Sequence, residues 1–123
     1  MRKPTLAEVE SVFLALSHET RRQVLVLLSQ RGGELPSGYL AARFAHSWPT
    51  TTRHLKVLEE AGLVEVRHEG RSSLYRLRRD HLWDVVSAWA RHFAPIGPDK
   101  TWESTGAKTA RELSNRTHER HRP

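Results

Sequence analysis

The fold is decided by the stretch SWPTTTRHLKVLEEAGLVEVRHEGRSSLYRL, residues 47–77. Its first half places three inward-facing side chains at a helical interval: Thr51, Leu55 and Leu58. Ser47 is a good cap for the start of this helix, and Pro49 is tolerated in its first turn. Gly62 is the residue type that most often follows the end of a helix. The pattern predicts a helix over about 48–61.

After Gly62 the apolar period changes from near 3.6 to two. Residues 63–68 and 72–77 then alternate as two strands, and Glu69-Gly70 supplies a turn with a residue that accepts positive φ. A two-stranded ribbon is only marginally stable alone, so this hairpin must pack on the helices. A hairpin directly after such a helix is typical of the wing of a winged-helix protein.

The residues before Ser47 predict the first half of a helix-turn-helix. A short helix is expected over 37–44, with Ser37 as its N-cap, and a three-residue turn, 45–47, leads into the longer helix. Two more helices precede it: one begins near Thr5, and another ends before Gly32. The fold class predicted is mainly α with a two-stranded β wing, a winged helix-turn-helix.

The two terminal helices of this domain carry apolar stripes that predict a symmetric dimer interface. On the last helix, over 79–93, the apolar residues are spaced four, three and four apart, as in a coiled-coil seam. A domain of this size would not fill both stripes from within, although packing of both on the monomer core is the alternative. The predicted interface residues are Leu6, Val9, Phe13, Leu82, Val86, Trp89 and Phe93.

Composition restricts the class of protein. The chain has 123 residues, 20 Lys and Arg against 14 Asp and Glu, and no cysteine. The excess of positive charge favours a polyanionic partner, and the lack of thiols excludes disulfides and thiolate metal sites. No stretch has the length of a membrane span or a signal peptide, so a cytoplasmic location is expected. Residues 1–95 are expected to form the domain, and 96–123 a polar, slightly basic, flexible tail.

Two stretches resemble the ArsR-type winged-helix repressors. ALSHETRRQVLVLL, residues 15–28, is similar to the opening signature of that family, and residues 47–77 are similar to its recognition helix and wing. Within the second stretch, RHLKVLEEAGLV at 53–64 matches the family's wording almost letter for letter. The resemblance covers roughly residues 5–94. It implies about five helices, a hairpin wing, a homodimer formed by the first and last helices, and repression of the chain's own or a neighbouring operon.

The outward face of the predicted recognition helix and the wing supply the predicted contacts to double-stranded DNA. Arg53 can fork onto guanine, whereas Lys56 more readily meets phosphate. The full predicted set is Ser47, Trp48, Thr50, Thr52, Arg53, Lys56, Arg67 and Arg71. A dimer would read a palindromic operator with these residues. Trp48 departs from the polar residue that the family often has there, and it either packs on sugars and thymine methyls or folds back.

Other residues of the same region keep two interpretations each. Ser47 is either only a cap or also a phosphate contact. His54 is expected to pack under the helix or bond to backbone rather than read bases. Arg21 and Arg22 are either phosphate contacts or surface charge.

No cofactor is predicted. The family resemblance implies a metal site of Asp and His residues on the last helix in some members, and His81 and His92 stand eleven apart here. The flanking positions hold Arg79 and Pro95 instead of ligands, so a metal-responsive repressor using the two histidines is an alternative only. An effector or partner protein that the sequence does not identify could act instead. A winged-helix protein-interaction module is the second alternative, and the chain has no motif of an enzyme.

Overall fold

The structure, a computed structural model, describes residues 3–44 and 47–96. In chain order its elements are α1 (Leu6–Leu16), α2 (Glu19–Gln30), β1 (Glu34–Pro36), α3 (Ser37–Arg43), α4 (Trp48–Glu60), β2 (Val64–Glu69), β3 (Ser72–Leu77), α5 (Arg79–Ala90) and a 3-10 turn (Arg91–Phe93). The described residues up to Trp89 form one compact unit, and Ala90–Ile96 belong to a second. The predicted tail beyond Ile96, like residues 45 and 46 of the predicted turn, lies outside the described residues.

The helix boundaries follow from local capping. Thr5 caps α1: its hydroxyl accepts the Glu8 N–H at 3.1 Å, and the Glu8 carboxylate accepts the Thr5 N–H at 3.1 Å. Ser47 caps α4 as predicted, and Gly62 follows α4 with φ of 74°. The prediction that Ser37 caps α3 is wrong. Pro36 holds the extended cap conformation because it ends a strand, so Ser37 falls inside the first helical turn.

The sheet has three antiparallel strands in the order β1-β3-β2. The predicted hairpin is present, with Val64 opposite Leu77 and Glu69 opposite Ser72, so the two-residue loop is Gly70-Arg71, one residue later than predicted. Gly70 takes φ of 60° at the first loop position, where a II′ turn requires it. The third strand was not predicted. It spans three residues and ends in Pro36, which an edge strand tolerates.

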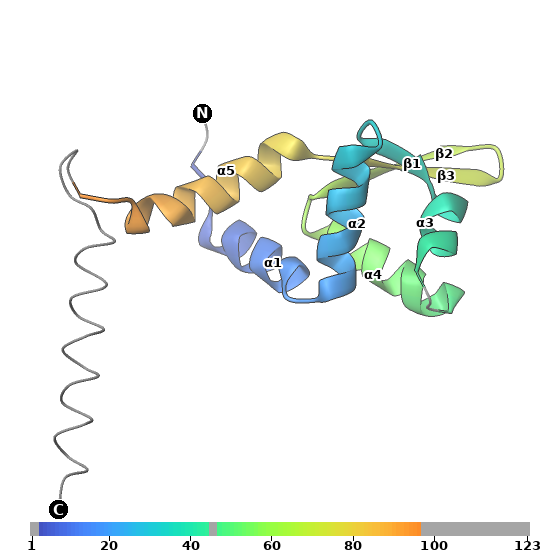
Figure 1. The fold of residues 1–123 in the computed structure, drawn as a ribbon, viewed down its shortest axis with the longest axis horizontal. Helices are drawn as coiled ribbons and strands as arrows, with labels where there is room; N and C mark the ends of the chain where they lie inside the picture. The colour runs from blue at the N-terminus through green and yellow to red at the C-terminus, as the bar shows by residue number, and fades with distance from the viewer. Residues whose placement is uncertain (1–2, 45–46, 97–123) are drawn as a thin grey trace, which may run out of the picture. The chain divides into compact units, whose positions relative to one another are not determined.

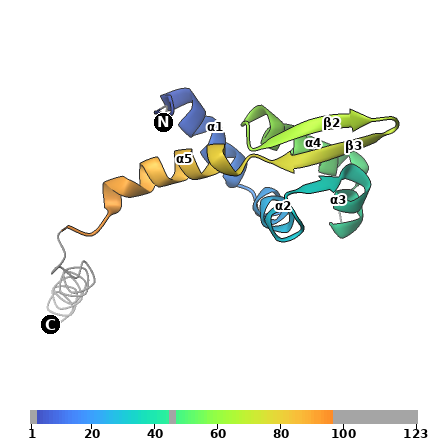
Figure 2. The same cartoon turned by 90° about the horizontal axis from the view of Figure 1, so that it is seen from above.

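The core lies where α1, α2 and α4 meet the sheet. Figures 1 and 2 show α3 and α4 lying alongside the strands, with the β2–β3 hairpin projecting away from α1 and α2. The most deeply buried apolar side chains come from every layer: Val12, Ala15, Val24, Leu28, Leu40, Leu55, Leu58, Leu63, Val64 and Val85. Within the described residues, no helix is both long and apolar enough to cross a membrane.

Candidate nucleic-acid interface

The recognition helix α4 separates a buried face from a polar face. Thr51, Leu55 and Leu58 are buried, as predicted. Arg53 and Lys56 are exposed on the opposite side, and within residues 3–44 and 47–96 neither makes an ion pair or a side-chain hydrogen bond. Two cations without protein partners therefore lie on the face of α4 that the core does not use. Such groups are available to phosphates or base edges.

The start of α4 carries the other predicted contacts. Ser47 accepts the Thr50 N–H at 3.4 Å and donates from its hydroxyl to the Thr50 hydroxyl at 2.9 Å, so it acts as a cap. Thr52 is exposed, and Thr50 is half-buried. The Trp48 indole is 54% exposed. More than half of this large apolar side chain therefore remains open at the end of the helix that enters a groove first in helix-turn-helix proteins.

A polar cluster under α4 connects the helix to the α1–α2 junction. The Arg21 guanidinium donates to the Ala15 carbonyl at 2.7 Å and the Leu14 carbonyl at 3.1 Å, and its Nη1 lies 3.3 Å from Nδ1 of His54. The His54 ring also packs on the His18 ring, with centroids 4.3 Å apart. His54 therefore packs beneath α4, as expected, where it contacts the side chains of Arg21 and His18.

The two arginines at the start of α2 have a structural role. Arg21 covers the last carbonyls of α1, and Arg22 donates to the Leu16 carbonyl at 2.7 Å. The final carbonyls of a helix have no partner within the helix, so these guanidiniums satisfy them. From the sequence alone, Arg21 and Arg22 were expected to be either phosphate contacts or surface charges. Nothing in the sequence pointed to this third role, the capping of α1 carbonyls.

The two arginines of the wing differ in their surroundings. Arg67 pairs with Glu34 on β1 at 3.1 Å and with Glu69 at 3.2 Å. Arg71, in the loop at the tip, is exposed and has no ion-pair partner in the part of the chain that the structure describes. The sequence alone does not distinguish the two arginines, and both were predicted to contact DNA. The unpredicted strand β1 brings Glu34 beside Arg67, so Arg71 is the wing cation that needs no release before it meets a phosphate.

The base of the sheet is also charge-paired. Glu65 of β2 pairs with Arg76 at 2.9 Å and with Arg78 at 2.7 Å. Burial, and secondarily the Glu59 carboxylate, raise the pKa of the Tyr75 phenol above its ordinary value. Tyr75 is therefore neutral near pH 7. The single Glu65 carboxylate offsets only one of the two guanidinium charges, so the base of the sheet stays net positive.

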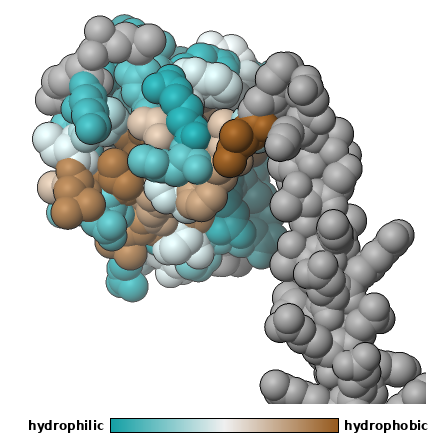
Figure 3. All heavy atoms as spheres, turned by 90° about the vertical axis from the view of Figure 1, so that its left-hand side faces the viewer, coloured by the Kyte–Doolittle hydropathy of each residue, from teal (hydrophilic) through white to brown (hydrophobic). Residues whose placement is uncertain are grey.

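Six of the seven predicted dimer residues lie on α1 and α5, and Phe93 lies in the 3-10 turn of the second unit. Leu6 is 77% exposed and Trp89 is 48% exposed, while the Trp89 ring meets Phe13 edge-on at 5.1 Å. Val9, Leu82 and Val86 are half-buried, and Phe93 is exposed. Figure 3 shows apolar side chains exposed among hydrophilic ones on the side where α1 and α5 lie. Val9, Phe13 and Leu82 pack against the monomer core beside Val12 and Val85, so the two stripes are only partly left over for a partner.

The two histidines of the alternative metal site lie in different compact units of the chain. His81 is half-buried beside Gly62, whereas His92 is exposed and its ring packs on Phe93 at 6.5 Å between centroids. Among the residues described, no group of three or more His, Cys, Asp or Glu side chains is placed to hold a metal ion. The metal-responsive alternative stays a prediction.

Comparisons with known proteins agree with this arrangement. The profile of a helix-turn-helix domain matches residues 16–67. The transcriptional repressor SdpR of Bacillus subtilis is 33% identical over 89 residues, which cover 72% of this chain and 96% of SdpR. The crystal structure of an ArsR family transcriptional regulator superposes with a TM-score of 0.69 at 25% identity, covering 81% of this chain and all of the other.

A second solved structure is the homodimeric winged helix-turn-helix DNA-binding domain of a Mycobacterium bovis protein, determined in solution. It superposes with a TM-score of 0.58 at 26% identity and covers 82% of this chain and 98% of that one. The residues that the helix-turn-helix profile matches include α4, which carries Arg53 and Lys56, and the start of the wing. The chain belongs to the ArsR family of winged helix-turn-helix proteins, and it is a DNA-binding transcriptional repressor.

Proposed function

We propose that the chain acts in the cytoplasm as a homodimer that represses its own or a neighbouring operon by binding a palindromic operator. The observation that carries this proposal is the pair of exposed cations on α4, Arg53 and Lys56, which have no partner among the described residues and lie opposite a buried helix face. A helix with one face in the core and free cations on the other suits insertion into a major groove. The proposal includes no enzymatic activity and no cofactor.

Homodimerisation is supported by the apolar surface on α1 and α5 and by the homodimeric relative. Leu6 and Trp89 would be covered by the partner's equivalent residues in an isologous interface. Such a dimer would present two α4 helices and two wings to the DNA. Two-fold symmetry in the protein then requires two-fold symmetry in the operator, with half-sites about one helical turn, or a multiple of it, apart.

The contacts divide into two kinds. Arg53, Thr50 and Thr52, with Trp48 at the helix start, would face base edges, whereas Lys56, Ser47 and Arg71 would meet phosphates. Arg67 would contribute to the field around the wing, with its guanidinium shared between DNA and the carboxylates of Glu34 and Glu69.

Footprinting on the DNA upstream of the chain's own gene tests the proposal. Protection of two related half-sites is expected at low salt. Arg53→Ala should weaken the footprinted site by about 1–3 kcal/mol and relax preference at one position per half-site. Lys56→Ala is the matched variant on the same helix face, and it should weaken all sequences alike. Absence of any DNA binding at low salt would instead favour a protein-interaction module, and equal behaviour of the two variants would refute the assigned roles.

A further inference from the structure

The first two residues of the recognition helix α4 are apolar and exposed. Trp48 is 54% exposed, and Pro49 beside it is exposed too and has no N–H to donate. The hydroxyl of the Ser47 cap donates to the Thr50 hydroxyl at 2.9 Å and accepts the Thr50 N–H at 3.4 Å, so these polar groups are engaged with each other. The leading end of α4 is therefore mainly apolar, and the indole is its largest part.

This end of a recognition helix is the end that contacts base edges in the major groove of helix-turn-helix complexes. The apolar group by which a base is recognised in that groove is the C5-methyl of thymine. An indole placed over donors and acceptors instead would remove their water and could return only one hydrogen bond, from its own Nε1–H. Thymine is therefore the base whose edge suits the Trp48 ring.

We propose that Trp48 makes the chain select thymine, through the C5-methyl group, at one fixed position of each operator half-site. The inference rests on the proposed function, because it requires α4 to lie in a major groove. Arg53 lies more than one turn further along α4, so the two side chains would read different base pairs. The operator would then be read by an uncharged contact at Trp48 in addition to the hydrogen bonds of Arg53.

Selection of duplexes from a random library by the full chain supplies the probe. Each thymine that the selected half-sites share is then replaced by uracil, one position at a time, which removes the methyl group and keeps every hydrogen-bonding atom. At one position the loss should be about fourfold per half-site, as expected for one methyl group returned to water, and about fifteenfold for a dimer on two half-sites. Because the contact is uncharged, this ratio should stay constant as salt rises, whereas the affinity itself falls.

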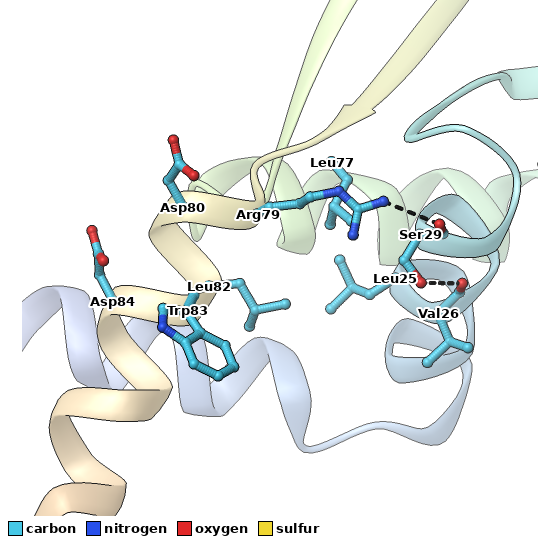
Figure 4. A pocket seen from close by; sticks show the side chains of 9 residues that line it. All are labelled: Leu25, Val26, Ser29, Leu77, Arg79, Asp80, Leu82, Trp83 and Asp84. Atoms are coloured by element: carbon cyan, nitrogen blue, oxygen red, sulfur yellow. Dashed lines mark hydrogen bonds between the residues drawn. The ribbon is translucent and has the colours of Figure 1, made fainter.

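Three variants assign the thymine preference to the indole. Trp48→Ala should bind the thymine and uracil duplexes alike at that one position. Trp48→Phe keeps an apolar ring without the Nε1–H, so it should keep most of the preference. Trp83→Ala is the matched control and should behave as the wild type, because Trp83 is 72% exposed on α5. It lies beside a hollow of about 760 Å³ that Leu25 of α2 and Leu82 of α5 line, and no residue of α4 lines that hollow (Figure 4).

The outcomes separate this inference from the proposed function. Selected half-sites that share no thymine, or equal affinity of the wild type for thymine and uracil duplexes at every position, would overturn the methyl contact and leave the repressor standing. A preference for thymine that persists in Trp48→Ala would place the contact on another residue and would also overturn the inference. Loss of affinity in Trp48→Ala with an unchanged thymine-to-uracil ratio would assign the indole to sugar or phosphate. Failure to enrich any sequence at low salt would refute the proposed function and this inference together.

Discussion

Removal of the Arg71 side chain tests how the wing meets DNA. Arg71 lies in the exposed two-residue loop between β2 and β3 and pairs with no carboxylate in the described part of the chain, so Arg71→Ala should leave the fold intact. Arg67 is the natural comparison because it lies on the same hairpin and carries the same charge. It differs in holding Glu34 and Glu69 at 3.1 and 3.2 Å.

The magnitude follows from the number of phosphate contacts that are lost, because each neutralised phosphate releases condensed counterions. A dimer carries two wings, and each neutralised phosphate contributes about 0.9 to the slope of log K against log salt, so Arg71→Ala should reduce that slope by about 1.8. At 0.15 M salt the same two contacts correspond to roughly thirtyfold in affinity, or about 2 kcal/mol. Arg67 shares its guanidinium with two carboxylates, so it is expected to neutralise less phosphate charge than Arg71 does. Arg67→Ala should therefore change the slope by less than half as much.

Fluorescence anisotropy of a labelled duplex over a series of salt concentrations measures both slopes. Any duplex serves, because phosphate contacts are independent of sequence. Arg31→Ala, at an exposed position at the end of α2, removes one charge outside the wing and should leave the slope near the wild-type value. Two results would refute the reasoning that ion pairing decides which wing cation is available to phosphate. One is a salt slope for Arg71→Ala equal to that of the wild type, and the other is a larger change of slope for Arg67→Ala than for Arg71→Ala.

Three further changes test the fold and the assembly. Gly62→Ala should destabilise the chain by about 1–2 kcal/mol in urea unfolding, because φ of 74° is strained for an L residue and the new Cβ would lie 3.2 Å from the His81 ring. Leu28→Ala, at a fully buried position of α2, should cost about 2–5 kcal/mol, whereas Val26→Ala, 53% exposed on the same helix, should cost under about 1 kcal/mol; equal costs would contradict the core as described. Leu6→Glu should leave the unfolding midpoint of the monomer nearly unchanged, since Leu6 is 77% exposed, but raise the dimer dissociation constant in sedimentation. An unchanged dimer would contradict the α1–α5 interface.

The parts of the fold that depend on neighbouring residues were predictable from the sequence. The apolar period of α4, its Ser47 cap, Gly62 after its end and the switch to alternation in the hairpin are all local, and each matches the structure within a residue or two. The outward face of α4 followed from the same period, so the exposure of Arg53 and Lys56 was foreseen. The sequence also indicated the apolar stripe on α1, but Val9, Phe13 and Leu16 of that stripe pack against the core, and its role in a dimer stays a prediction.

The structure decided what depends on residues far apart in the chain. Strand β1 is too short to give a pattern and exists because Leu35 and its neighbours pair with β3 some forty residues later. That pairing brings Glu34 to Arg67 and so distinguishes the two wing arginines. Likewise, Arg21 reaches His54 across 33 residues, and the hollow beside Trp83 exists only where α5 passes α2. By itself the sequence determined which residues are helical, turned or outward-facing, because those properties come from periods and caps. The tertiary structure decided which charges are already paired and where a cavity lies, because both depend on which distant side chains the folded chain brings together.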